Sequence, residues 1–244
     1  MSNPFQVVRD FEAALCEYTG APYAVTTTSC TAALMLAVAW HIRNNPATHG
    51  NWQYPKSAIE IPKRTYVGVP MSIIHAGGRP TFREEWWSGA YQLKPLPIWD
   101  SARYFTGGLY KGTWNHGTVE NGKLPSGKDY QINITETRDL AGQMVCVSFH
   151  WSKTLGIQQG GAILHDDPEA DRWLRMARFD GRQEGMHPKD QKDWILGHHC
   201  YMAPETAAAG LVRLANLPRH NEPLPWGPGT DSDYPDLSQM SIFQ

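Results

Sequence analysis

Short candidate strands alternate with candidate helices along most of this chain, and this order constrains the fold more than any other feature. The strands are expected at 23–25, 57–61, 79–83, 97–99, 144–149 and 162–165. The helices are expected at 3–20, 32–40, 67–76, 168–177 and 204–215, where several segments begin at a Pro or repeat apolar residues at three- and four-residue steps. This order predicts a three-layer α/β fold, with a mostly parallel sheet covered by helices on both faces.

Composition and charge exclude several classes of protein. The 244 residues are enough for one large α/β domain or two small ones, and 41% hydrophobic with 19% charged residues is a globular composition. The formal net charge of −2 argues against a protein that binds nucleic acid by neutralising phosphates. The longest apolar run, 32–40, is far shorter than the about 20 residues of a membrane-spanning helix. We therefore expect neither a nucleic-acid partner nor a membrane partner.

The N-terminus and the cysteines predict a cytoplasmic location. Residues 1–5 do not resemble a secretory signal, because they have neither a basic nor an apolar segment. The four cysteines, Cys16, Cys30, Cys146 and Cys200, are far apart and form no CxxC pair. This spacing argues against a disulfide framework or a zinc site, so we expect no bound metal.

The pattern of elements predicts one large domain followed by a tail. Residues 1–217 hold all the candidate helices and strands. Within them, 107–131 is polar, rich in Gly and without a helical or strand period, which indicates an inserted loop or hairpin. Residues 218–244 are rich in Pro and are expected to form an extended C-terminal tail without a core of its own.

A hydroxyl-rich turn joins the first candidate strand to the most apolar helix. Residues 26–31 read Thr-Thr-Thr-Ser-Cys-Thr and lead into 32–40. The first N–H groups of a helix have no partner within it and its dipole favours negative charge, so this turn is a candidate phosphate site. A plainer interpretation is a Thr-rich turn that caps a core helix, and the segment alone leaves both open.

Lys153 is the leading candidate for chemistry. It follows the apolar strand 144–149 and precedes Gly160-Gly161. A lysine in a tight, partly dry turn can have its pKa lowered and act as a Schiff-base nucleophile. A lone lysine is more often a solvated surface charge, so the identification depends on the residues that accompany it.

Three features accompany this lysine. They are the turn at 29–31, the acid Asp100 at the end of an apolar strand, and Ser148. Pyridoxal 5'-phosphate (PLP) needs parts of this kind. Its phosphate is bound by a helix N-terminus and hydroxyls, its ring nitrogen by a carboxylate, and its aldehyde by a lysine.

Five motifs in a fixed order connect the chain to a known family. They are Ser29-Cys30-Thr31-Ala32-Ala33-Leu34, Ile61-Pro62 with Thr65-Tyr66-Val67, Asp100-Ser101-Ala102, Ser148-Phe149 with Lys153 and Gly160-Gly161, and Gly197-His198-His199-Cys200-Tyr201-Met202. Together they resemble the DegT/DnrJ/EryC1/StrS family of PLP-dependent sugar aminotransferases and cover most of residues 5–217. The resemblance implies the fold-type-I large domain, as in aspartate aminotransferase. It also implies a shortened member in which the C-terminal small domain is largely missing.

The resemblance assigns roles to single residues. Lys153 would form the Schiff base with the cofactor and then shuttle a proton. Asp100 would keep the pyridine nitrogen protonated, and Tyr66 would stack on the ring, although it could also be plain core. The cofactor phosphate would be held by Ser29, Cys30, Thr31 and Ser148.

Two further positions depart from the family pattern. Arg103 stands where the family usually has Gln or His near the cofactor's 3-hydroxyl. His199 stands where the family has an Asn that reaches the cofactor phosphate of a neighbouring subunit, although it could also be a capping or packing residue. The position of His199 implies a homodimer with shared active sites.

The implied reaction moves an amino group from glutamate or glutamine to a keto-sugar that is linked to a nucleotide. Two alternatives stay open: a PLP enzyme of another type, such as a dehydratase or decarboxylase, and a non-catalytic protein of the same fold that binds PLP or a partner chain. The related sugar dehydratases have His in place of the lysine, so Lys153 favours transamination. Only 18 positions separate Phe82 from Asp100, and the strand and helix that the family normally has there are nearly absent. The cofactor is therefore better supported than the substrate.

Overall fold

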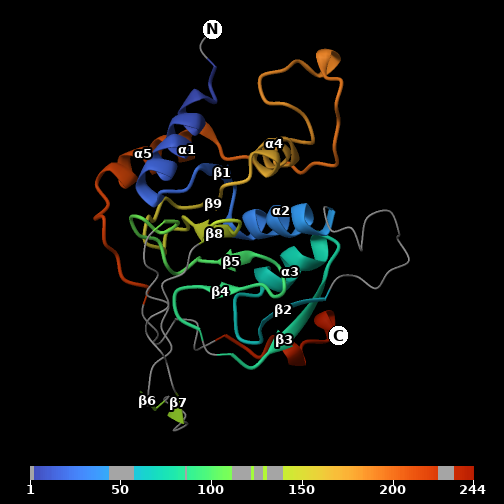
Figure 1. Ribbon diagram of the computed structural model, residues 1–244, viewed down its shortest axis with the longest axis vertical. Coiled ribbons are helices and arrows are strands. Elements are labelled where there is room, and N and C mark those ends of the chain that lie inside the picture. The colour runs from blue at the N-terminus through green and yellow to red at the C-terminus, as the bar shows by residue number, and fades with distance from the viewer. Residues whose placement is uncertain are drawn as a thin grey trace.

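A five-stranded sheet forms the centre of the fold (Figure 1). In spatial order its strands are β1 (Tyr23–Thr27), β9 (Gly161–His165), β8 (Met144–Ser148), β5 (Ile98–Asp100) and β4 (Tyr91–Gln92). The computed structural model describes residues 3–43, 58–85, 87–111, 140–224 and 234–244, and the backbone of 122–123 and 129–130. A separate pair, β2 (Ala58–Pro62) and β3 (Arg79–Arg83), continues past β4 through backbone hydrogen bonds between Glu60 and Lys94.

The strand directions are more mixed than the sequence predicts. β5 and β8 are parallel, as are β2 and β3, whereas β9 is antiparallel to both β1 and β8, and β4 is antiparallel to β5. The cause is the length of the connections. Residues 149–160 link β8 to β9, and 93–97 link β4 to β5, without a helix in either link. Links of this kind join antiparallel neighbours, whereas parallel neighbours need a crossover.

Helices cover both faces of the sheet, which confirms the three-layer α/β class. On one face lie α1 (Gln6–Thr19) and α5 (Pro204–Ala215), and on the other lie α2 (Cys30–Arg43), α3 (Gly68–His75) and α4 (Pro168–Ala177). Side chains of β8 alternate between the two cores. Every residue of β8 and β9 is buried, as expected for strands covered on both faces.

Local signals explain where the helices begin and end. α1 begins at Gln6 instead of Asn3, because the Asn3 side chain accepts a hydrogen bond from the Phe5 N–H at 3.0 Å and forms a turn before the helix. Gly20 ends α1 with a φ of 80°, which is the usual glycine C-cap. Asp167 caps α4, as its position before Pro168 predicts, by accepting hydrogen bonds from two N–H groups of the first turn.

The remaining elements are short. Inside the predicted 107–131 insertion, β6 (Gly122–Lys123) pairs antiparallel with β7 (Asp129–Tyr130), and the rest of 112–139 lies outside the described residues. Within the described residues, one-turn 3-10 helices form at η1 (Pro188–Asp190), η3 (Leu237–Gln239) and η4 (Ser241–Phe243). Of the predicted tail, residues 234–244 return to the body of the domain and end beside β3 (Figure 1).

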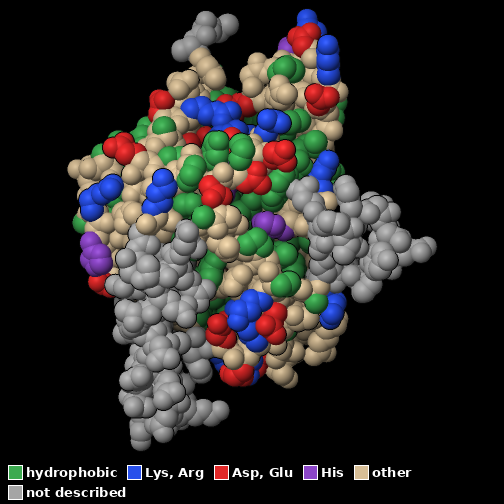
Figure 2. Space-filling model, viewed as in Figure 1, with side chains coloured by type: hydrophobic (Ala, Val, Ile, Leu, Met, Phe, Trp, Pro, Cys, Tyr) green, Lys and Arg blue, Asp and Glu red, His purple; other side chains and the backbone are tan. Residues whose placement is uncertain are grey.

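The surface carries charges of both signs. On the face that Figure 2 shows, Lys and Arg side chains are interspersed with Asp and Glu. In the described part of the chain, no helix has the length and apolar character needed to cross a membrane.

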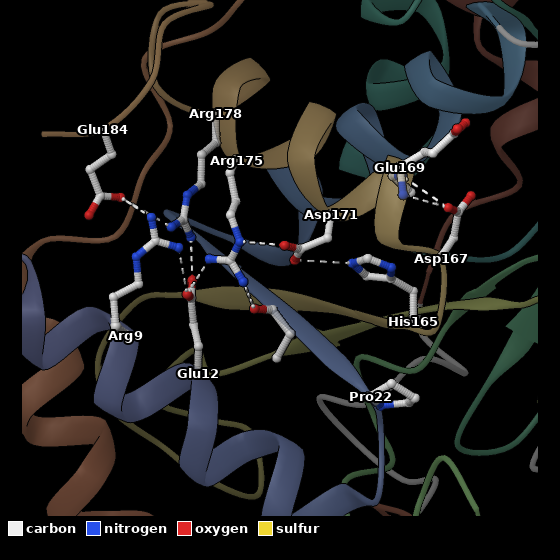
Figure 3. Close-up of polar contacts among 12 residues, drawn as sticks. Arg9, Glu12, Pro22, His165, Asp167, Glu169, Asp171, Arg175, Arg178 and Glu184 are labelled. Atoms are coloured by element: carbon white, nitrogen blue, oxygen red, sulfur yellow. Dashed lines mark hydrogen bonds and ion pairs between the residues drawn. The ribbon is translucent and has the colours of Figure 1, made fainter. Parts of the chain in front are cut away.

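A buried ionic cluster joins α1, β1 and the end of α4 (Figure 3). The Glu12 carboxylate accepts hydrogen bonds from Arg178 Nη1 and Arg175 Nη1, each at 2.5 Å, and from the Thr26 N–H at 3.0 Å. Glu12 and Arg178 are 3% and 0% exposed. Burial on its own raises the pKa of Glu12, but the guanidinium groups of Arg178 and Arg175 outweigh it and lower the pKa to about 2. The pair is therefore ionised inside the protein.

Candidate active site

A cavity of about 270 Å³ lies where the carboxyl ends of the parallel strands β5 and β8 meet the first turn of α2. Open α/β sheets bind their ligands at such an edge. Eight of the nine predicted site residues line this cavity: Ser29, Cys30, Thr31, Tyr66, Asp100, Arg103, Ser148 and Lys153. The fold thus brings together residues that are up to 124 positions apart, from Ser29 to Lys153.

The hydroxyl-rich turn ends β1 and caps α2. Ser29 Oγ accepts a hydrogen bond from the Ala32 N–H at 3.1 Å, and Thr27 Oγ1 donates to the Ser29 carbonyl at 2.9 Å. β9 passes directly behind the turn, since a Cβ at Gly161 would lie 2.5 Å from the Cys30 nitrogen. The missing side chain lets the start of α2 lie against the sheet at the cavity, where helix N–H groups favour an anion.

Lys153 lies in a tight turn between β8 and β9. Its N–H donates to the His150 carbonyl at 2.8 Å, and the Trp151 N–H donates to the Gln158 carbonyl at 3.0 Å across the turn. Gly156 has a φ of 60°, and a Cβ there would lie 3.1 Å from a carbonyl oxygen of the same turn. These bonds hold the backbone that places the lysine in the cavity wall.

Asp100 lies at the floor of the cavity, only 5% exposed, and both of its oxygens accept hydrogen bonds. The Ala102 N–H donates to Oδ1 at 2.9 Å and the Tyr91 hydroxyl donates to Oδ2 at 2.8 Å, while Cys30 Sγ lies 4.0 Å from Oδ1. The Tyr91 oxygen also lies 2.7 Å from Thr65 Oγ1. Burial, and next the Asp100 charge, raise the pKa of Tyr91 well above its ordinary value. The phenol therefore keeps its proton and remains a donor to the carboxylate.

Sequence reasoning missed Tyr91 because β4 is only two residues long and too short to show a period. The available signal was the position of Tyr91 in the shortened interval between Phe82 and Asp100. In so short an interval, a residue is a candidate to contact the aspartate. It also missed Tyr234, which reaches the cavity from the tail, and Trp87, which follows β3.

We expect Tyr91→Phe to weaken PLP binding by about tenfold, because a hydrogen bond to a charged group contributes about 1.5–3 kcal/mol. Phenylalanine lacks the hydroxyl that donates to Asp100 Oδ2, so the carboxylate loses a hydrogen bond that fixes its orientation. The measurement is a PLP titration followed by absorbance. Tyr110→Phe is the matched control, since Tyr110 is equally buried but donates to the Gln143 carbonyl at 2.9 Å. Equal PLP affinities for the two variants would contradict the role of Tyr91.

His199 is the predicted site residue that the structure leaves out of the cavity lining. Its side chain is 71% exposed, and Nδ1 lies 3.0 Å from Asp180 Oδ2. The next residue is close to the site, because the Thr28 N–H donates to the Cys200 carbonyl at 2.9 Å. His199 therefore follows the chain past the hydroxyl-rich turn but does not line this chain's own cavity.

The lining residues fit PLP. A buried carboxylate, a lysine and a helix N-terminus with hydroxyl groups surround one cavity, which are the three contacts this cofactor requires. Two of the lining residues, Tyr66 and Thr31, come close to each other at Gly68. A Cβ added at Gly68 would lie 2.7 Å from the Tyr66 ring and 2.9 Å from Thr31 Oγ1. Tyr66 thus lies near the turn that would hold the phosphate, and as a residue 54% exposed it lines the open end of the cavity.

The sequence matches the model of the DegT/DnrJ/EryC1/StrS aminotransferase family over residues 2–85 and 139–223. This match contains seven of the nine predicted site residues and leaves out Asp100 and Arg103. No curated protein matches the chain.

Solved structures of this fold are similar to the chain at low sequence identity. A putative PLP-dependent aminotransferase from Bacillus cereus has 17% identity and a TM-score of 0.58, covering 86% of this chain and 58% of its own. A sugar aminotransferase from Micromonospora echinospora has 17% identity and a TM-score of 0.58, covering 86% and 60%. A mutant of GDP-4-keto-6-deoxymannose-3-dehydratase (ColD) has 15% identity and a TM-score of 0.58, covering 87% and 61%.

These similarities confirm the predicted fold type I, and with the family match they confirm PLP as the cofactor of this fold. The chain spans about three fifths of the length of these structures. The family match covers well over half of the chain and includes the lysine turn and the hydroxyl-rich turn. The chain belongs to the DegT/DnrJ/EryC1/StrS aminotransferase family.

Proposed function

We propose that this protein is a PLP-dependent aminotransferase that moves an amino group from glutamate or glutamine to a nucleotide-linked keto-sugar. The observation that carries the proposal is the presence of Lys153 and the buried Asp100 in the lining of one cavity, beside the N-terminus of α2. A cytoplasmic location and a homodimer with shared sites are parts of the same proposal.

The lining residues would have different tasks in binding PLP and moving protons. When bound, PLP supplies an electron sink for the bonds of the amine that is being transferred. The Lys153 amine would hold the cofactor aldehyde and afterwards move a proton at its Nζ. The Asp100 carboxylate would keep a proton on the ring nitrogen, and the hydroxyls of Ser29, Thr31 and Ser148 would bind the phosphate. Tyr66 would cover the ring and exclude water from one face.

A dehydratase is the second candidate, because one of the similar structures is the dehydratase ColD. Against it stands Lys153, since the family resemblance implies that the related sugar dehydratases have His at this position. A lysine amine can both hold the cofactor and move a proton, which suits transamination.

The test is a half-reaction on the PLP-loaded protein. L-glutamate should convert the bound cofactor to pyridoxamine phosphate, seen as a change in the absorption spectrum, with release of an equal amount of 2-oxoglutarate. D-glutamate is the matched control and should leave the spectrum unchanged. If PLP binds but neither L-glutamate nor L-glutamine converts it, the aminotransferase assignment is wrong and the dehydratase or the non-catalytic alternative replaces it.

We expect His199 to act on the site of a second copy, because its side chain is exposed and does not line its own cavity. His199→Ala and Lys153→Ala should each lose the L-glutamate half-reaction as pure proteins. A refolded equal mixture should regain about a quarter of the wild-type amplitude, because half of the dimers would be mixed and each would hold one complete site. No recovery, in a mixture shown to exchange subunits, would contradict a shared site.

A further inference from the structure

The C-terminal segment 234–244 is anchored to the loop that carries Tyr66. The Leu237 N–H donates to the Lys63 carbonyl at 2.9 Å, and Arg64 Nη1 donates to the Tyr234 carbonyl at 3.0 Å. Asp236 Oδ2 also pairs with Lys63 Nζ at 3.0 Å. Leu237 is fully buried, so the segment is held by apolar packing as well as by polar contacts at its start.

These anchors place the Tyr234 side chain in the lining of the cavity. Its ring lies 6.4 Å from the Tyr66 ring, centroid to centroid, at an interplanar angle of 55°. Tyr66 is half-exposed, whereas Asp100 at the floor is buried. Tyr66 and the neighbouring Tyr234 therefore lie at the mouth of the cavity. A second reactant that enters through this mouth would pass Tyr234.

The family match ends at residue 223, so this part of the wall is built by residues beyond it. The chain also spans only about three fifths of the similar structures. A cavity that binds two reactants in turn needs a wall on the side of the substrate as well as on the side of the cofactor. Of segment 234–244, Tyr234 lines the cavity, and the anchors from Asp236 and Leu237 hold it there.

We propose that segment 234–244 forms the substrate-side wall of the active site and that Tyr234 is its specificity-determining residue. The inference rests on the proposed function and deepens it. The Tyr234 ring offers an apolar face and a hydroxyl to the amino acid donor and then to the sugar acceptor, a combination that suits a substrate with both C–H and O–H groups. The wall also limits the access of water and small solutes to the Lys153–cofactor bond.

The first experiment measures that access and needs no substrate. The hydroxylamine nitrogen adds to the former aldehyde carbon of PLP and displaces the Lys153 amine, so the cofactor leaves as its oxime, which absorbance follows. Tyr234→Ala should speed this release by about tenfold, because a lost aromatic wall opens the mouth. Tyr234→Phe should restore the slow rate, since it keeps the ring. Ile242→Ala, an exposed position in the same segment, is the matched control and should match the wild type.

The second experiment separates affinity from rate in the L-glutamate half-reaction. Tyr234→Ala should raise the L-glutamate concentration for half-maximal conversion by about tenfold, with a limiting rate within about threefold of the wild type, as expected for a residue that only binds substrate. PLP affinity should stay the same, which shows that the variant is folded.

The outcomes separate the two proposals. If wild-type protein binds PLP but does not respond to L-glutamate or L-glutamine, the proposed function fails, while the hydroxylamine rates still test the wall. If Tyr234→Ala matches the wild type in both hydroxylamine release and L-glutamate affinity, the wall proposal is overturned whatever the reaction is.

Discussion

Lys153→Ala is expected to abolish the covalent attachment of PLP and to slow the L-glutamate half-reaction by about 100- to 10,000-fold, the range for a positioned acid–base group. The reason is local. In the described lining of the cavity, Lys153 is the one primary amine, and the turn from Phe149 to Gly160 holds it there. The measurement is the absorption spectrum with added PLP, followed by borohydride reduction and mass analysis of the protein.

Wild-type protein should gain the mass of the reduced cofactor on the peptide that contains Lys153, and the variant should gain none. Lys189→Ala is the matched control, because Lys189 is an exposed lysine in η1 that does not line the cavity. Equal labelling of the wild type and Lys153→Ala would show that the cofactor reacts elsewhere and would remove the basis of the proposed function. The protein would then share only its fold with the aminotransferases.

Glu12→Gln should lower the free energy of unfolding by about 3–5 kcal/mol, the range for breaking a buried ion pair. Without the Glu12 charge, the buried Arg178 keeps a longer ion pair, to Glu184 at 3.6 Å. Arg178, fully buried, and Arg175 both donate to this carboxylate at 2.5 Å. Glutamine keeps the shape but not the charge. Urea unfolding at neutral pH measures the loss, and Glu17→Gln, an exposed position on the same helix, is the control and should change stability little.

The ionic cluster around Glu12 makes the stability of the folded protein depend on pH. The pKa of Glu12 is about 2 in the folded protein against 4.5 for the ordinary group, so its folded-state pKa is depressed. Its contribution to stability is therefore fully present above about pH 4.5 and is lost as the pH falls through the folded value. Wild-type stability should decline over this window more steeply than that of Glu12→Gln. Parallel curves for the two proteins would contradict the assignment.

The cluster also supports the active site. Arg178 Nη1 donates to the Thr26 carbonyl at 2.6 Å, and the Arg178 carbonyl accepts from the Cys200 N–H at 3.0 Å. Cys200 in turn accepts from the N–H of Thr28, just before Ser29. Loss of the Glu12 charge should therefore loosen the hydroxyl-rich turn as well as the core.

Much of the architecture could be read from local signals. Pro168 and Pro204 each begin a helix as expected, Gly20 ends α1, and the strand at 79–83 has the predicted bounds. Capping, proline geometry and periodicity act within a few residues, so one sequence contains all that they need. The lysine turn was recognisable for the same reason, because its glycines and the strand before it are neighbours in the chain.

The sequence by itself determined the α/β class, the bounds of most elements to within three residues, and eight residues that meet in one cavity. Only the tertiary structure decided the strand directions, the hydrogen bond from Tyr91 to Asp100, and the place of Tyr234 in the cavity lining. Tyr91 reaches Asp100 through a two-residue strand, and Tyr234 reaches Tyr66 from 168 positions away. Such contacts depend on how distant segments pack against each other, and no local periodicity or helix cap in the sequence predicts that packing.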